Sequence, residues 1–230
     1  MRNWGLSGLA VMALLLAACG NGVNEPVDIA EGERRDGDVS VVNGDITLGD
    51  GAEVTGSLRT VNGSIRLGVG ARAGGVETVN GRIRLGNEAR VDSVDSVNGG
   101  IVLGENAQSR GPIQSVNGSI TLRSGVEVAG DVTNVNGNMR LESARIDGSL
   151  RSRSGDIYLL DGSELTGSLR IEEVRRGDRD RRPRVVIGEN SVVGGEIVAE
   201  RRVRLVVHES VELGEVRGAE VERYTGEPPR

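Results

Sequence analysis

Aromatic residues are almost absent from this 230-residue chain: they make up 1% of it, and Phe is missing altogether. A globular enzyme of this size normally fills its core with aromatic rings, because each ring buries a large area. Hydrophobic residues as a whole account for 37% of the chain, so the core is expected to be aliphatic and thin. This composition disfavours a conventional globular enzyme.

Cysteine and histidine are equally scarce, with one residue of each. A single Cys excludes a disulfide framework and a thiolate metal site. The single His, His208, lies near the last repeat in Val206-Val207-His208-Glu209, with no second functional group evident beside it. We therefore predict that the chain is not an enzyme and has no catalytic residue, cofactor or metal site. His208 is interpreted as a surface or cap residue.

Lysine is also missing, so all 28 basic residues are Arg, and 34 acidic residues outnumber them to give a formal net charge of −6. A general nucleic-acid-binding protein shows a basic face or stripe instead. We predict that nucleic acid is not a partner.

The N-terminus has the features of an export signal. Arg2 is the only charge before Glu25, and the apolar run over 9–18 is too short to span a bilayer comfortably. The run ends in Leu16-Ala17-Ala18-Cys19-Gly20, which resembles a bacterial lipobox. The resemblance implies a lipoprotein signal peptide over 1–18, cleavage before Cys19 and lipidation of Cys19, for example with palmitate. The alternative is an ordinary signal peptide that contains a Cys by chance.

Lipidation of Cys19 would make the membrane a partner, because two or more acyl chains give stable anchoring. Residue 20 is Gly, and the absence of an Asp there favours the outer membrane over inner-membrane retention. The predicted localisation is the bacterial cell envelope, with periplasmic or surface exposure left open. The lipidated Cys and the polar, Gly-rich residues that follow it, 19–37, are expected to form a flexible tether.

The body of the chain is a repeat with steps of 18 or 19 residues. The copies are VNGDITLG from Val42, VNGSIRLG from Val61, VNGRIRLG from Val79, VNGGIVLG from Val97, VNGSITLR from Val116 and VNGNMRLE from Val135, with a decayed copy, RSGDIYLL, from Arg153. A fixed period near twenty residues indicates a solenoid.

Apolar residues within one repeat are spaced for three short strands. Ile46 and Leu48 are two residues apart, as are Ala52 and Val54, so each pair points to one face of a strand. Leu58 begins a third strand that ends near Val61, and each break between strands contains Gly, which takes the positive φ of a sharp corner. This pattern predicts an all-β fold: a single-stranded, triangular parallel β-helix over 38–220, with right-handed winding favoured.

Asn-Gly between apolar residues is also the strongest short signal for a β-hairpin. A hairpin at Asn62-Gly63 would put Val61 on the polar face with Arg59, Ser64 and Arg66. The solenoid was expected to bury that Val, and it explains the constant period. An antiparallel β fold remains the alternative.

One Asn per repeat is expected to stack at a corner of the solenoid. Amides in such a column can hydrogen-bond from coil to coil and fix the register. A polar recognition edge is the functional alternative. The ladder comprises Asn43, Asn62, Asn80, Asn98, Asn117 and Asn136.

Outward side chains that align from coil to coil are where a solenoid would bind a ligand. The column that contains Thr47, Thr121 and Tyr158 also carries Arg66, Arg84 and Arg140, which could meet an anionic polymer such as a lipopolysaccharide phosphate. A solvated mixed face is the alternative. No outward column reads as a carboxylate ladder, which disfavours stacked calcium sites.

The repeat lapses after Leu169. Residues 175–184, RRGDRDRRPR, are expected to form an exposed Arg-rich loop between coils, and their Arg176-Gly177-Asp178 tripeptide is interpreted as a chance match to an integrin motif. The repeat then resumes in a looser form, and 221–230 are expected to be a C-terminal tail.

The VNGxIxL copies over 42–159 resemble bacterial adhesin-type β-solenoid repeats. The segment 184–218, with RVVIGENSVVGGEIVAE and VELGEVRG, is similar to bactofilins, the polymer-forming bacterial cytoskeletal proteins. The second resemblance implies a right-handed triangular β-helix that assembles end to end. Neither family implies catalytic residues.

Two functions follow as hypotheses. The first is a non-catalytic envelope lipoprotein whose β-helical scaffold assembles through its ends into homo-oligomers or filaments, because terminal coils expose unpaired strand edges. The second is a monomeric, adhesin-like module that binds an envelope polysaccharide or a protein partner.

Overall fold

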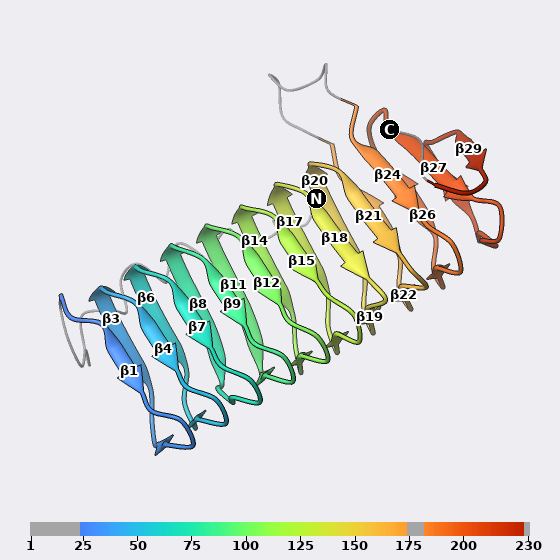
Figure 1. Cartoon of the computed structure of the whole chain (residues 1–230). Coiled ribbons are helices and arrows are strands. Elements are labelled where there is room, and N and C mark those ends of the chain that lie inside the picture. The colour runs from blue at the N-terminus through green and yellow to red at the C-terminus, as the bar shows by residue number, and fades with distance from the viewer. Residues whose placement is uncertain (1–23, 174–181, 228–230) are drawn as a thin grey trace.

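A computed structural model describes residues 24–173 and 182–227, and these residues form a parallel β-solenoid of about ten turns without any helix. Figure 1 shows the coils stacked along one axis, from β1 (Val27–Ile29) and β3 (Val39–Asn43) at one end to β29 (Val221–Tyr224) at the other. The parallel pairing confirms the predicted β-helix and excludes the antiparallel alternative. The right-handed winding stays a prediction.

The Ile-x-Leu segments of the repeat build the first side of each coil, an eleven-stranded sheet. Its strands, in spatial order, are β1 (Val27–Ile29), β4 (Ile46–Leu48), β7 (Ile65–Leu67), β9 (Ile83–Leu85), β12 (Ile101–Leu103), β15 (Ile120–Leu122), β18 (Met139–Glu142), β21 (Ile157–Leu160), β24 (Arg184–Ile187), β27 (Arg204–His208) and β29 (Val221–Tyr224).

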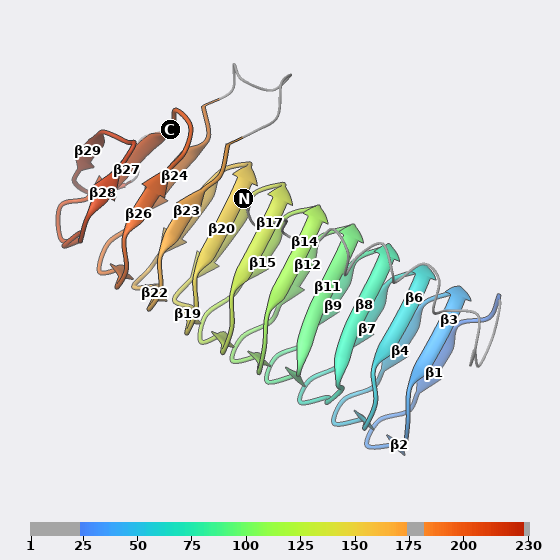
Figure 2. The same cartoon turned by 180° about the vertical axis from the view of Figure 1, so that it is seen from behind.

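A ten-stranded sheet, seen from behind in Figure 2, forms the second side, and six of its strands end in the Asn of the VNG motif. Its strands are β3 (Val39–Asn43), β6 (Leu58–Asn62), β8 (Gly75–Asn80), β11 (Ser93–Asn98), β14 (Ile113–Asn117), β17 (Val132–Asn136), β20 (Leu150–Ser154), β23 (Leu169–Ile171), β26 (Ile197–Ala199) and β28 (Val216–Arg217).

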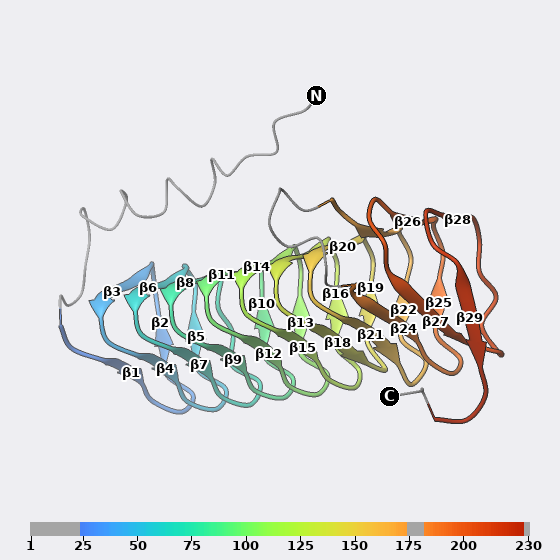
Figure 3. The same cartoon turned by 90° about the horizontal axis from the view of Figure 1, so that it is seen from above.

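Two-residue strands form the third side, which lies between the other two in the view of Figure 3. They are β2 (Arg34–Arg35), β5 (Glu53–Val54), β10 (Arg90–Val91), β13 (Gln108–Ser109), β16 (Glu127–Val128), β19 (Arg145–Ile146), β22 (Glu164–Leu165) and β25 (Val192–Val193). Isolated bridges from Glu53 to Arg72 and from Arg72 to Arg90 connect β5 with β10.

The core is a set of aliphatic columns in strict register. Ile46 pairs with Ile65 and Leu48 with Leu67 in the next coil, and all four side chains are buried. Because each inward side chain packs on its counterpart in the coils before and after it, one coil alone cannot bury its apolar face, and stability comes from stacking.

The Val of the VNG motif does not enter this core, contrary to the prediction. Val61 is half-buried on the outer side of β6, and Thr60 takes the inward place. Thr60 Oγ1 donates to the carbonyl of Gly44 at 3.0 Å, and Thr78 Oγ1 donates to that of Gly63 at 3.0 Å. Thr60 and Thr78 are therefore tolerated inside because each hydroxyl hydrogen-bonds to the corner glycine of the preceding coil.

The glycines of the VNG corner were expected to have positive φ, and the structure gives a different reason for glycine there. The VNG glycines Gly63, Gly81 and Gly99 do not have positive φ; instead, an added Cβ would lie within 2.0 Å of the carbonyl oxygen of the glycine one coil earlier. Positive φ occurs at the next corner, where Gly70 and also the non-glycine residues Glu88 and Asn106 adopt it. Close stacking, rather than backbone handedness, therefore demands glycine at these three positions, whereas the VNG glycine Gly137 also has a positive φ of 144°.

Both predicted boundaries of the solenoid were too narrow. The first coil begins at Val27, inside the expected tether, because Val27 and Ile29 continue the columns of Ile46 and Leu48. At the other end, β29 occupies residues expected to be a tail and pairs with β27. Of the predicted Arg-rich loop, Arg184 belongs to β24, while 174–181 lie outside the described residues.

Candidate ligand-binding face

The outer face of the eleven-stranded sheet carries the arginines that the sequence suggested as a binding surface. Arg66 on β7 and Arg84 on β9 are paired neighbours in adjacent coils. Arg140 on β18 lies three coils beyond Arg84, separated from it by Val102 and Thr121. The structure therefore brings together two of the three predicted residues, while Arg140 stands apart and forms an ion pair with Glu142 on its own strand.

A third arginine, Arg82, completes the cluster and was missed by the sequence analysis. A hollow of about 460 Å³ is lined by Arg82 together with Ser64, Arg66, Gly81, Arg84, Asn98, Gly99 and Gly100. Arg82 belongs to the neighbouring outward column, two residues before Arg84. The hollow exists because that column continues into Gly100, whose missing side chain leaves space beside Arg82 and Arg84.

The charges around this hollow are incompletely balanced. Arg66 Nη1 lies 2.7 Å from Asp45 Oδ2. Arg82 and Arg84 have no carboxylate within ion-pair distance among the described residues. The hollow is thus a locally basic site on an acidic chain, and guanidinium groups suit phosphate and carboxylate ligands.

The Asn column forms a continuous chain of side-chain amide hydrogen bonds. The Nδ2 of each Asn donates to the Oδ1 of the Asn one coil earlier, at 2.7–2.9 Å. The bonds join Asn43, Asn62, Asn80, Asn98, Asn117 and Asn136, and Asn43 extends the ladder to Asn24 at 2.7 Å. The amides mostly satisfy one another, so the ladder is built for register.

The outer face of the ten-stranded sheet carries a column of charged side chains in which not every acidic residue has a basic neighbour. Arg59 contacts both Asp38 at 3.1 Å and Glu77 at 3.3 Å. Asp95 follows Glu77 in the next coil, and Gln114 follows Asp95. Burial and, to a lesser extent, the negative charge of Glu77 raise the pKa of the Asp95 carboxyl to about 6.

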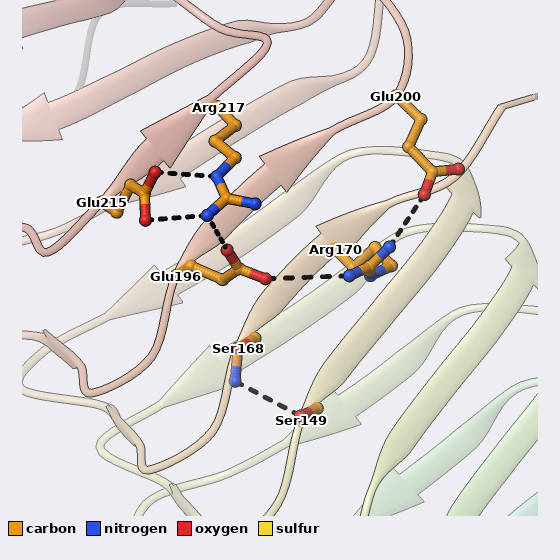
Figure 4. Close-up of polar contacts among 7 residues, drawn as sticks. All are labelled: Ser149, Ser168, Arg170, Glu196, Glu200, Glu215 and Arg217. Atoms are coloured by element: carbon orange, nitrogen blue, oxygen red, sulfur yellow. Dashed lines mark hydrogen bonds and ion pairs between the residues drawn. The ribbon is translucent and has the colours of Figure 1, made fainter.

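An ion-pair network ties the last coils of this sheet together (Figure 4). Glu196, the residue before β26, lies between Arg170 on β23, at 3.8 Å, and Arg217 on β28, at 3.5 Å. Arg217 also contacts Glu215 at 2.8 Å, and the hydrogen bond from Arg217 lowers the pKa of the Glu215 carboxyl. Because these side chains are substantially exposed, each contact is expected to contribute little to the free energy of unfolding.

His208 lies at the C-terminal end of the rod and is buried. Its Nδ1 is 2.9 Å from Ser210 Oγ, and its ring packs edge-on against Tyr224, with ring centroids 5.2 Å apart. This packing fits a cap residue. Within the described part of the chain, no group of three or more His, Cys, Asp or Glu side chains is placed to hold a metal ion.

The predicted lipidation site, Cys19, lies outside the described residues. Over 24–173 and 182–227, no helix is long and apolar enough to cross a membrane. Comparisons of the chain with protein families, with curated proteins and with solved structures find no match. The function must therefore be argued from the residues and the geometry alone.

Proposed function

We propose that the chain is a non-catalytic envelope lipoprotein whose solenoid is a monomeric binding module for an anionic envelope polysaccharide. The observation that carries this proposal is the basic hollow between Arg82 and Arg84, since their guanidinium groups have no carboxylate partner among the described residues. The adhesin-type character of the repeats supports the same role.

The charges at the two ends of the rod favour a monomer. Residues 24–38 of the first coil contain six acidic and two basic residues, and residues 209–227 of the last coil contain the same numbers. Head-to-tail stacking would therefore bring two negative ends together, which costs free energy at neutral pH.

Charged side chains also stand at core positions in the terminal coils. Arg35 aligns with the buried Val54, and Arg223 aligns with the buried Val207. The Arg223 guanidinium donates to the carbonyls of His208, at 3.1 Å, and Val211, at 2.6 Å. Inward-pointing charges of this kind are a recognised means of blocking edge-to-edge association of sheets.

End-to-end assembly of the bactofilin type is the second candidate. It is favoured by the edges of the sheets: β1 and β3 at one end, and β29 and β28 at the other, have a neighbour on one side only among the described strands. Their free backbone donors and acceptors could pair with a second copy.

Light scattering separates the two candidates. For the chain from Gly20 to Arg230, we expect one monomer mass over the accessible concentration range at physiological salt. The control is Arg223→Leu, which restores an apolar core position at the C-terminal end and should promote association. Concentration-dependent rods of the unaltered chain, seen by negative-stain microscopy, would reject the monomer and support assembly.

Lipid anchoring at Cys19 has its own test. We expect Cys19→Ser to prevent both acylation and cleavage, because the sulfur is the acylated atom. In a bacterial host, the unaltered chain should fractionate with outer membranes and incorporate labelled palmitate, while the variant should keep its first 18 residues and incorporate none. Label in the variant, or a soluble unaltered chain, would contradict the lipoprotein assignment.

A further inference from the structure

We propose that the basic hollow is a specific site for a phosphate monoester, held by the Arg84 guanidinium and the Arg82 backbone N–H, with Arg66 and Arg82 side chains around it. The inference rests on the proposed binding role and assigns to it a site and a ligand class.

The chain itself provides the template for oxyanion binding, one coil earlier. Asp45 Oδ1 accepts a hydrogen bond from the backbone N–H of Ser64 at 2.8 Å, and Asp45 Oδ2 accepts one from Arg66 Nη1 at 2.7 Å. These two donors lower the pKa of the Asp45 carboxyl, the backbone N–H of Ser64 having the larger effect. A negatively charged oxyanion is therefore stabilised between a corner N–H and an arginine two residues later.

The same arrangement recurs at another corner of the solenoid. Asp38 accepts from the backbone N–H of Ser57 at 2.7 Å and from Arg59 at 3.1 Å. Asp131 accepts from Ser149 N–H at 2.8 Å and contacts Arg151 at 3.0 Å. The pairing of an oxyanion with a corner N–H and the arginine two residues on is thus a property of the stacked corners.

At the hollow, a corner backbone N–H and an arginine two residues later are again present, but a Ser hydroxyl stands where the Asp carboxylate would be. One coil further along, Ser64 occupies the position that Asp45 holds in the first arrangement. Arg82 then takes the position of the corner N–H donor Ser64, and Arg84 takes the position of Arg66. The Ser64 hydroxyl cannot supply an anion. Neither the Arg82 backbone N–H nor the Arg84 guanidinium has an acceptor among the described residues, so both donors can serve an external oxyanion.

Size and charge favour phosphate over carboxylate. The hollow of about 460 Å³ is larger than one carboxylate needs. Gly100, where an added Cβ would meet only Ser119 O at 3.4 Å, lets a ligand approach the backbone closely. The two guanidinium groups without a carboxylate partner, those of Arg82 and Arg84, match the double charge of a phosphate monoester, and Arg66, paired with Asp45, lies beside them.

Titration of the full chain in detergent with inorganic phosphate, at constant ionic strength, tests the site by amide NMR. We expect saturable shifts centred on the Arg82 and Gly100 amides. Glucose 6-phosphate should bind at least tenfold more tightly if the natural source is a sugar phosphate, whereas equal affinities would indicate free phosphate.

Two variants and one matched control make the test specific. Ser64→Asp should occupy the site with an internal carboxylate and weaken phosphate binding at least tenfold, as should Arg84→Gln. Asp at this corner position is native at Asp45, so Ser64→Asp should fold. Arg140→Gln removes an arginine from the same outer column three coils away, and it should leave binding unchanged.

Uniform shifts at many arginines, or an equal loss of binding in Arg140→Gln, would overturn the site. So would unchanged binding in Ser64→Asp. Because this readout does not depend on the oligomeric state, an assembled chain that binds phosphate at Arg82 would refute the monomeric module and keep the site. A monomer that binds envelope polysaccharide at another place, and does not bind phosphate at Arg82, would refute the site and keep the monomeric binding module.

Discussion

The Gly99→Ala variant is expected to be destabilised by about 3 kcal/mol or more, with a fall in Tm on the order of 10 °C. An added Cβ at Gly99 would lie 1.8 Å from the carbonyl oxygen and 2.6 Å from the carbonyl carbon of Gly81. Both atoms are backbone atoms of the coil below, so relief requires the two coils to separate and the neighbouring hydrogen bonds of the ladder to lengthen. Thermal unfolding followed by circular dichroism measures the loss.

The adjacent glycine supplies the matched control. At Gly100, the only atom that an added Cβ would meet is Ser119 O, at 3.4 Å, and Gly100 does not have positive φ. Gly100→Ala should therefore stay within about 0.5 kcal/mol of the unaltered chain. Similar small effects of both substitutions would show that the coils are free to move apart at this corner, and the stacked-glycine explanation would fail.

This contrast also shows where the sequence was sufficient and where it was not. The repeat of 18 or 19 residues, with Ile and Leu two apart, was enough to predict a parallel solenoid, because only stacked coils bury such short strands. The reason for the VNG glycine could not be read from one repeat. It depends on the distance between Gly99 and Gly81, which belong to different coils.

The residue that points inward on the strand before the VNG corner was also predicted wrongly, because its partner belongs to another coil. Val61 is more apolar than Thr60, so hydrophobicity favoured Val61 as the core residue. Strict alternation from the buried Leu58 would have chosen Thr60, and the structure follows the alternation. What stabilises the inward Thr is a carbonyl supplied by Gly44 in the preceding coil, which no local pattern reveals.

The candidate site was predictable in part. The repeat spacing places Arg66 and Arg84 in adjacent coils of one outward column. The same spacing places Arg140 three coils beyond Arg84. Arg82 belongs to a different column, and its importance comes from the glycine at position 100 in the next coil and from Ser64 in the preceding one. The site is therefore a property of three coils and two columns, whereas the sequence analysis considered one column at a time.

The Asp95→Asn variant is expected to be more stable than the unaltered chain at pH 7.5, by on the order of 2–3 kcal/mol, and equally stable at pH 4. The pKa of the Asp95 carboxyl is raised from its ordinary 3.8 to about 6, mainly by burial and then by the charge of Glu77. Asn has nearly the same shape and no charge to desolvate. Tm measured between pH 4 and pH 8 for both proteins gives the comparison.

The direction of the pH dependence follows from proton linkage. Between pH 4 and pH 6, the folded chain holds a proton on Asp95 that the unfolded chain has lost, so the free energy of unfolding attributable to this residue falls as the pH rises. Above about pH 7, one unit past the folded pKa, the penalty is complete and constant, and Asn avoids it throughout. Asp28→Asn, at an exposed position on β1, is the control and should leave the difference between pH 4 and pH 7.5 unchanged.

Parallel stability curves for Asp95→Asn and the unaltered chain would mean that the Asp95 carboxylate is solvated in the folded state. A smaller gain that vanishes when Glu77→Gln is added would instead identify charge repulsion, rather than burial, as the main cause.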